Sequence, residues 1–324
     1  MQIFQTLMRR FLRRMVLGVL TYFLIVSPMN VSESQTYQEI TPTDAYYVAQ
    51  SIEQALVQMY GLSRELFEKP YISQNLRPRN VYQKALAVLK EFQTLHPDAI
   101  DPVQLAEARN LDINTATLKE VYQLLSLMQK YLDARVVLEN DLREQEPQTP
   151  SDVYHMLRQV SWRHYQIAQK QEIPTDWATP ARVYEATVMN ILPAVQAIAE
   201  DAEISYDDYA FPKQPVSGLI PRYIYKLLSQ VYRNIAAYAQ QQGDYDPIVL
   251  RQVTECDEIS PADVFDLVQV ITAELKAEIG EKTLMPDTAA RYARWKEEHE
   301  NVVPGHVFRL MQYNYILTKK ILKK

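Results

Sequence analysis

The stretch Thr149–Val160 reads TPSDVYHMLRQV and contains every local signal that starts an α-helix. Thr149 suits the N-cap position, where its hydroxyl accepts a hydrogen bond from a backbone N–H of the first turn. Pro150 follows at the first helical position, where its missing N–H costs nothing. Asp152 is at the third helical position, where a carboxylate faces the positive end of the helix and reaches back to the cap. We therefore predict a helix that begins at Pro150.

The same pattern occurs eight times along the chain. Each copy places a small or branched apolar residue and then an aromatic residue at the same two offsets from the predicted start. Five copies have Ser or Thr at the cap, and four of these five have an acidic residue three positions later. The eight copies begin at Thr41, Pro78, Thr117, Thr149, Thr179, Pro221, Ser260 and Pro304. The apolar spacing of three and four residues that follows each start is typical of amphipathic helices.

Longer segments in the two halves of the chain also resemble each other. Residues 76–92 (LRPRNVYQKALAVLKEF) align with residues 219–235 (LIPRYIYKLLSQVYRNI), and residues 101–129 align with residues 246–274. The offset within each pair is 143 to 145 residues. We interpret the resemblance as an internal duplication of four helices. The segments that start at residues 101 and 246 also predict a short additional helix in each half.

The duplication suggests how the chain is divided. We predict a first four-helix unit over residues 35–172 and a second over residues 173–324. The two units would be helical bundles or parts of one curved helical array. Pro193 interrupts a helical pattern in the second unit and predicts a kink near Met189.

Composition supports an all-α fold. The chain has 324 residues, of which 47% are hydrophobic and 23% are charged, and this is the composition of a folded protein. Only 6 residues are glycine, against an average usage of about 7%. Tight β-hairpins and phosphate-binding loops both depend on glycine. Its scarcity favours helices with proline-marked connections and argues against a nucleotide-binding fold.

Residues 1–34 differ from the rest of the chain. Four arginines between positions 9 and 14 precede an apolar run over residues 15–26, and small and polar residues follow. The run is shorter than the roughly 20 residues that span a bilayer, and the order of the parts is that of a secretory signal peptide. We predict cleavage after Ser34 and a periplasmic mature protein. The alternative is an uncleaved signal that anchors the chain to the inner membrane, facing the periplasm.

Charge and cysteine content restrict the partners and the compartment. Removal of residues 1–34 would take away four arginines and one glutamate and change the formal net charge from −6 to −9. A chain this acidic is a poor candidate for nucleic-acid binding, which depends on a basic surface. Cys256 is the single cysteine, so no internal disulfide can form. An exported chain without disulfides suits a bacterial periplasm.

Motifs of metal and hydrolytic sites are not found in the sequence. The histidines, at positions 96, 155, 164, 299 and 306, form no Glu-x-x-His, H-E-x-x-H or C-x-x-C-H motif. His155 and His164 are expected on opposite sides of one helix, at the surface or rim. No G-x-S-x-G motif occurs, and Cys256 lies in the acidic run TECDE, where we expect a half-buried, unreactive side chain. We therefore assign no catalytic, cofactor-binding or metal-binding residues and no cofactor.

Three further features permit a binding role. Each helix has an aromatic residue one turn after its start, and we call these residues the aromatic column. They are expected to pack against neighbouring helices, although together they could bind an extended ligand. The proline-rich segments 67–79 and 211–222 occupy equivalent places in the two halves and are either long connections or paired binding edges. The four lysines in the last six residues favour a helix C-terminus and could contact a membrane surface.

The sequence leaves three functions open. We predict first a non-enzymatic periplasmic binding or scaffold module that holds another envelope protein. The first alternative is a periplasmic small-ligand sensor or binding protein with a pocket between helices or between the halves. The second is an enzyme without recognisable motifs. A buried polar cluster between the halves would favour the small-ligand alternative, whereas a broad exposed apolar patch would favour the scaffold.

Overall fold

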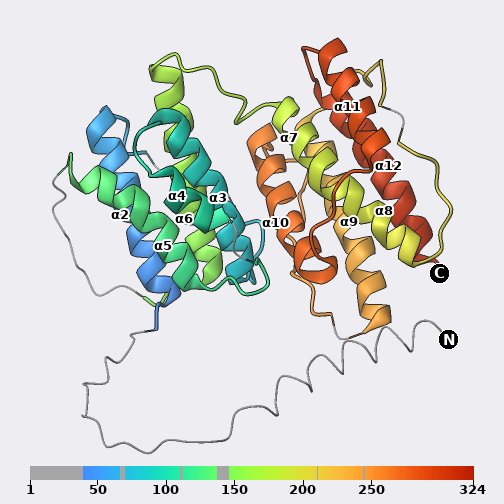
Figure 1. Cartoon of the computed structure of the whole chain (residues 1–324), viewed down its shortest axis with the longest axis horizontal. Coiled ribbons are helices and arrows are strands. Elements are labelled where there is room, and N and C mark those ends of the chain that lie inside the picture. Colours follow the sequence, from blue (N-terminus) through green and yellow to red (C-terminus); the bar gives the residue numbers. More distant parts are fainter. Residues whose placement is uncertain (1–38, 66–69, 110–111, 137–145, 210, 244) are drawn as a thin grey trace, which may run out of the picture. The chain divides into compact units, whose positions relative to one another are not determined.

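The computed structural model describes residues 39–65, 70–109, 112–136, 146–209, 211–243 and 245–324. Every regular element in these ranges is a helix (Figure 1), apart from an isolated antiparallel bridge between Ser73 and Leu250. The predicted all-α class is therefore confirmed. None of the helices in these ranges combines the length and hydrophobicity needed to cross a bilayer. The predicted signal segment lies outside the described residues.

All eight predicted starts begin a helix at the expected residue. The helices of the first half are α2 (Pro42–Tyr60), α3 (Pro78–Leu95), the short α4 (Pro102–Arg109), α5 (Leu118–Asp133) and α6 (Pro150–Lys170). The helices of the second half are α7 (Pro180–Ala186), the π-helix η2 (Thr187–Ile191), α8 (Leu192–Asp201), α9 (Pro221–Gln242), α10 (Pro261–Ile279), α11 (Pro286–Glu298) and α12 (Pro304–Leu322).

The helix caps form as the sequence predicts. Thr149 accepts a hydrogen bond from the Asp152 backbone N–H at 3.3 Å, and the Asp152 carboxylate accepts one from the Thr149 N–H at 2.7 Å. The same reciprocal pair of bonds closes the first turns that follow Thr41 and Ser260. At Thr117 the hydroxyl accepts from the Lys119 N–H, and the Glu120 carboxylate accepts from the Thr117 N–H. Each pair satisfies backbone donors that the helix itself leaves unpaired.

One local prediction is wrong, and one helix has no predicted counterpart. The short helix expected from Asp246 does not form, whereas α11 forms without a predicted start. The backbone after Asp246 finds other partners: the Ile248 N–H donates to the Tyr232 hydroxyl at 3.0 Å, and the Arg251 N–H donates to the Ile72 carbonyl at 2.8 Å. These tertiary hydrogen bonds replace the helical ones, so the segment stays extended. The matching segment in the first half does form a helix, α4.

The hydrogen-bond pattern of the α7–α8 helix changes where Pro193 predicts a disturbance. The π-helix η2 lies between α7 and α8 and contains Met189. Proline has no N–H to donate to the preceding turn, and a wider turn accommodates this loss. The side-chain amide of Asn190 also donates to the Ala186 carbonyl at 2.8 Å, within the same region.

The four main helices of the first half all run in the same direction. Near their first turns, the Leu76 N–H donates to the Ser151 hydroxyl at 3.1 Å and the Gln148 N–H donates to the Thr43 hydroxyl at 3.0 Å. At the opposite end, the Tyr60 and Tyr131 hydroxyls lie 3.2 and 3.4 Å from the two ring nitrogens of His96. Around the bundle the order is α2, α5, α3, α6.

The second half has the same parallel arrangement. Pro180, Pro221, Pro261 and Pro304, the first residues of α7, α9, α10 and α12, line one small cavity at the shared N-terminal end. Around the bundle the order is α7–α8, α10, α9, α12. This order matches that of the first half when helices are paired by the predicted repeat. The shared order is compatible with the predicted duplication, which stays a prediction together with the unit boundary after residue 172.

Helices α3 and α10 connect the two bundles and run antiparallel to each other (Figure 1). Asn80 near the start of α3 contacts Glu274 near the end of α10, whereas Lys84 further along α3 contacts Asp266. The buried apolar side chains of both bundles belong to one contiguous cluster. The aromatic column is mostly core, because Tyr82, Tyr154 and Tyr184 are each 1% exposed. Packing, the favoured interpretation of these rings, is therefore confirmed for the buried members.

Candidate binding site between the two bundles

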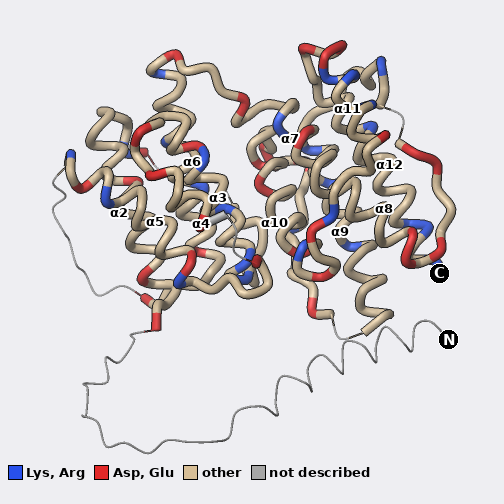
Figure 2. Tube along the Cα trace, in the orientation of Figure 1, with Lys and Arg blue, Asp and Glu red and all other residues tan. Residues whose placement is uncertain are grey.

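Helices α3, α6 and α10 all carry charged positions (Figure 2). Basic side chains of α3 and α6 form buried ion pairs with acidic side chains of α10. Arg158 of α6 donates through Nε to Asp266 Oδ2 at 2.9 Å and through Nη2 to Asp263 Oδ1 at 2.8 Å. Lys84 of α3 donates to the other oxygen of Asp266 at 2.7 Å. Burial by itself would lower the pKa of Arg158, but Asp266 and Asp263 raise it above its usual value. Each of the two basic groups is therefore paired with an acidic one.

Asp263 has two structural roles. One carboxylate oxygen accepts from the backbone N–H and the hydroxyl of Ser260 and so completes the capping box of α10, while the other oxygen accepts from Arg158. The first turn of α10 is thereby tied directly to α6 of the other bundle. The Tyr154 hydroxyl adds a hydrogen bond to the Asp266 backbone carbonyl at 3.0 Å.

A second buried carboxylate, Glu91 near the C-terminal end of α3, joins three elements. It accepts from Arg182 Nη2 of α7 at 3.0 Å and from the Ser161 hydroxyl of α6 at 2.6 Å, and His164 Nδ1 lies 3.6 Å away. Burial by itself would raise the pKa of Glu91, but the adjacent His164 and the charges of Arg182 and Lys84 lower it to about 2. Glu91 is therefore ionised at neutral pH and acts as a hydrogen-bond acceptor.

These charged groups surround a cavity of about 400 Å³ between the bundles. Its size lies within the range of small-molecule sites. The charged side chains that line it are Lys84, Glu91, Arg158, Arg182, Asp263 and Asp266. Three are positive and three negative, so the cavity wall carries no formal net charge.

Aromatic side chains line the same cavity. They are Trp162 and Tyr165 of α6, Trp177 of the connection to α7, and Phe265 of α10. The rings of Trp162 and Tyr165 are 5.3 Å apart, and the Arg182 guanidinium lies 3.8 Å from the centre of the Phe265 ring. Two Trp rings, a Tyr and a Phe beside paired charges give a wall that combines apolar area with oriented polar groups, as in ligand pockets generally.

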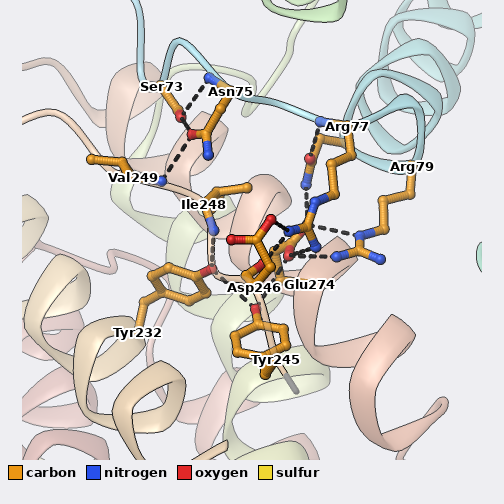
Figure 3. Close-up of polar contacts among 11 residues, drawn as sticks. Ser73, Asn75, Arg77, Arg79, Tyr232, Tyr245, Asp246, Ile248, Val249 and Glu274 are labelled. Atoms are coloured by element: carbon orange, nitrogen blue, oxygen red, sulfur yellow. Dashed lines mark hydrogen bonds and ion pairs between the residues drawn. The ribbon is translucent and has the colours of Figure 1, made fainter. Parts of the chain in front are cut away.

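A different polar cluster closes the interface at the other end of α3 (Figure 3). Glu274 of α10 is 1% exposed and accepts two hydrogen bonds from Arg79 at 2.8 and 2.7 Å, one from Asn80 at 3.0 Å and one from Tyr245 at 3.2 Å. Burial by itself would lower the pKa of Arg79, but Glu274 raises it. A charged pair with this many hydrogen bonds is expected to hold its geometry. We call Glu274, Arg77, Arg79, Asn80 and Tyr245 the polar joint.

Backbone contacts extend the polar joint into the neighbouring connections (Figure 3). Asn75 accepts a hydrogen bond from the Val249 N–H at 2.9 Å, next to the bridge between Ser73 and Leu250. Arg77 also contacts the backbone carbonyl of Asp246. The described part of segment 67–79 thus contacts the other bundle. The equivalent segment 211–222 contacts α11 instead, since the Trp295 indole donates to the Pro212 carbonyl at 2.8 Å.

The structure corrects the positions of two residues considered as candidates. His164 is fully buried, not at the surface or rim, because the face of α6 that carries it is covered by α3 and the connection to α7. Cys256 is exposed, not half-buried, because the helix expected around it does not form. His155 is partly buried and stacks on Tyr71 with ring centres 4.5 Å apart. Among the described residues, no cluster of three His, Cys, Asp or Glu residues could hold a metal ion.

The charged residues of the cavity are not among the residues predicted to have a role. One signal was available: Lys84 and Glu91 are seven residues apart, which is about two turns and places them on one face of α3. This face also carries buried apolar residues such as Val88. Charged residues within an apolar stripe are rarely buried without partners, so they indicate partners elsewhere. The sequence gives no means of identifying α10 as that partner.

A second hollow is found on the surface of the second bundle. It has a volume of about 510 Å³ and lies along α9 and α12, with Tyr223, Leu227, Phe308 and Tyr315 among its lining residues. Tyr223 is 43% exposed, so apolar surface is available to solvent here.

Comparison of the chain with family models, curated proteins and solved structures returns no match.

Proposed function

We propose that this chain is a non-enzymatic binding protein that holds a small molecule in the cavity between its two helical bundles. The observation that carries the proposal is the cavity of about 400 Å³, because both bundles contribute charged and aromatic side chains to its wall. Binding sites occur preferentially between the helices of bundles and at interfaces of this kind. The buried polar cluster between the halves also favours a small-ligand binding protein over the scaffold module that we first predicted from the sequence.

The state of the polar groups supports binding without chemistry. Glu91 has a pKa of about 2 and accepts hydrogen bonds on both oxygens, so it is poorly suited to donate or remove protons near neutral pH. Asp266 is likewise occupied on both oxygens, by Arg158 and Lys84. Groups held this firmly are suited to orient a ligand.

We further propose that the protein acts in the periplasm. The basic and apolar segments within residues 1–34 and the lack of any possible internal disulfide support this location. Fractionation of cells followed by N-terminal sequencing of the protein tests it. A mature chain that begins after Ser34 supports export with cleavage, whereas an intact N-terminus in the inner-membrane fraction supports the anchored alternative.

Binding can be tested with the tryptophans of the chain as reporters. Two of the three, Trp162 and Trp177, line the cavity, while Trp295 packs against Tyr184 elsewhere. We expect a metabolite mixture extracted from the periplasm to change the tryptophan fluorescence, to raise the melting temperature and to leave a bound mass in native mass spectrometry. The Trp295→Phe variant should keep the fluorescence response, and the Trp162→Phe/Trp177→Phe variant should lose it. No response and no bound mass from any extract contradicts the proposal.

A second candidate function is the one first predicted from the sequence, the binding of an envelope protein. The surface hollow along α9 and α12 favours it, because Tyr223 and its neighbours offer apolar area that a partner could cover. Cross-linking in the native envelope through a photoreactive residue at position 223, with position 278 on exposed α10 surface as control, distinguishes the two functions. A protein adduct specific to position 223 supports the second candidate.

A further inference from the structure

We infer that the ligand of the cavity between the bundles is an uncharged, hydroxyl-rich ring compound, of which a mono- or disaccharide is the representative class. This inference rests on the proposed function and specifies it. Three features of the cavity wall support it: the charges are already paired, the polar groups have hydrogen-bonding capacity left for hydroxyl groups, and the aromatic side chains offer faces for a ring.

The charge pairing disfavours a charged ligand. Arg158 is engaged by Asp263, by Asp266 and by the Pro70 carbonyl, which leaves it poorly placed to clamp an anion. Arg182 is engaged by Glu91. A charged ligand would have to compete with one of these buried pairs, and separating a buried pair leaves an uncompensated charge. A neutral ligand avoids this cost.

Polar groups at the cavity wall retain hydrogen-bonding capacity of both kinds. The guanidinium of Arg182, whose side chain is 13% exposed, carries five N–H donors, and its contacts with Glu91 and with the Trp177 carbonyl use two of them. The partly exposed Ser161 hydroxyl donates to Glu91 and keeps its lone pairs as acceptors. A hydroxyl group both donates and accepts, so a molecule with several hydroxyls can use donors and acceptors on the same wall. Simple anions and cations use only one kind.

The aromatic side chains supply the remaining recognition. Trp162, Tyr165 and Trp177 are partly buried, so they are covered by protein on one side and still contribute to the cavity. The face of an aromatic ring is electronegative, and the C–H groups on one face of a sugar ring are weakly positive. Stacking of the two faces removes apolar area from water while the hydroxyls at the ring edge reach the charged groups.

Titration of defined probes tests the ligand class. We propose to measure binding by calorimetry and tryptophan fluorescence with D-glucose, D-galactose, maltose and trehalose as neutral probes. L-glutamate, L-arginine and glycine betaine serve as charged or zwitterionic probes of comparable or smaller size. The expected result is saturable binding of at least one neutral probe, whose dissociation constant changes less than twofold between 50 and 500 mM NaCl, roughly as expected when no charges pair on binding.

Matched variants separate stacking from general damage. Trp177→Ala should weaken binding of the neutral probe about tenfold or more, Trp177→Phe should restore most of it, and Trp295→Phe should leave it unchanged. Ser161→Ala, which changes only a neutral partner of Glu91, provides a second variant with little risk to folding. Equal affinities in Trp177→Ala and the unmodified protein, with both folded by circular dichroism, would overturn the stacking argument.

The outcomes distinguish this inference from the proposed function. Binding of a charged probe alone, with affinity that falls as salt rises, overturns the inference and leaves the proposed function standing. A metabolite of another class captured from periplasmic extract does the same. Failure of every probe and of every extract to bind overturns both.

Discussion

Arg158 shows how much the interface depends on single buried side chains. Its guanidinium joins α6 to two carboxylates of α10 and to the Pro70 carbonyl, and the residue is 4% exposed. The pairing is costly to form, because both charges leave water. The same burial makes the pair costly to break, because removal of one charged side chain leaves the opposite charge buried without a neutralising partner.

We expect Arg158→Met to lower the free energy of unfolding by about 3–5 kcal/mol, because the buried carboxylates of Asp263 and Asp266 both lose the charge of the guanidinium that they contact. Urea denaturation monitored by circular dichroism measures the change. Lys296→Ala serves as the control, since its pair with Glu185 is about half exposed and should change stability by no more than about 0.5 kcal/mol. A loss below about 1 kcal/mol in Arg158→Met would contradict the buried pairing.

The depressed pKa of Glu91 predicts a dependence of stability on pH. The carboxyl has a pKa of about 2 in the folded chain and about 4.5 when unperturbed. Its contribution to stability is therefore complete above about pH 4.5 and is lost as the pH falls towards 2. The shift corresponds to a contribution on the order of 3 kcal/mol.

The Glu91→Gln variant isolates this contribution, because glutamine does not titrate. We expect the unmodified chain to lose stability between pH 5 and 2 more steeply than the variant, with a difference on the order of 3 kcal/mol over this range. Denaturation in urea at several pH values provides the measurement. Parallel curves for the two proteins would show that Glu91 is not held ionised by its neighbours.

At the scale of elements, the repeated helix start has a consequence that appears only when the helices are assembled. The main helices of each bundle are parallel, so their positive N-terminal ends lie together. The acidic residue at the third position offsets this local positive charge in four of the eight helices, at Asp44, Glu120, Asp152 and Asp263. Ordinary antiparallel bundles alternate their helix ends and have no such need.

The caps should be measurable one at a time. Thr149→Ala removes the cap of α6 and should cost about 1 kcal/mol of stability, whereas Thr149→Ser keeps the hydroxyl and should cost little.

A capping hydroxyl can also be added at the start of α9, where the cap residue Ile220 is 42% exposed and makes no side-chain cap bond. We expect Ile220→Thr to gain about 0.5–1 kcal/mol. Thermal unfolding of the three variants tests both directions, and equal stabilities would contradict the capping argument.

At the scale of the whole molecule, the polar joint and the cavity occupy the two ends of the same antiparallel contact between α3 and α10. The joint is filled by Glu274 and its hydrogen-bond donors, whereas the other end encloses a hollow. Hydrogen bonds to charged groups are directional, so Glu274 and its donors fix how the start of α3 lies against the end of α10.

We expect Glu274→Ala to loosen the joint while each bundle stays folded, because the substitution leaves Arg79 and Asn80 without their acceptor. Hydrogen exchange should become faster in residues 77–84 and 245–251 and stay slow in the core of α12. Glu278→Ala is the matched control, since this residue is exposed one turn further along α10. Unchanged exchange in both segments would show that the apolar core alone holds the bundles together.

The sequence by itself determined the helical class and the start of each main helix. Thr149, Pro150 and Asp152 act within one turn, so the interactions that begin the helix need no distant partner. Local rules failed where distant partners compete: the segment after Asp246 has a helical pattern, yet its backbone bonds to Tyr232 and Ile72.

Only the tertiary structure decided which helices meet and what lies between them. Lys84, Glu91 and Arg158 are charged residues on otherwise apolar faces, and nothing local to them specifies α7 or α10 as their partners. The long connections allow the helices of each bundle to run parallel, so neighbours cannot be inferred from chain order. The cavity forms because charged and aromatic side chains from α3, α6, α7 and α10 come together. Their proximity depends on how the helices pack and cannot be inferred from any one segment of the sequence.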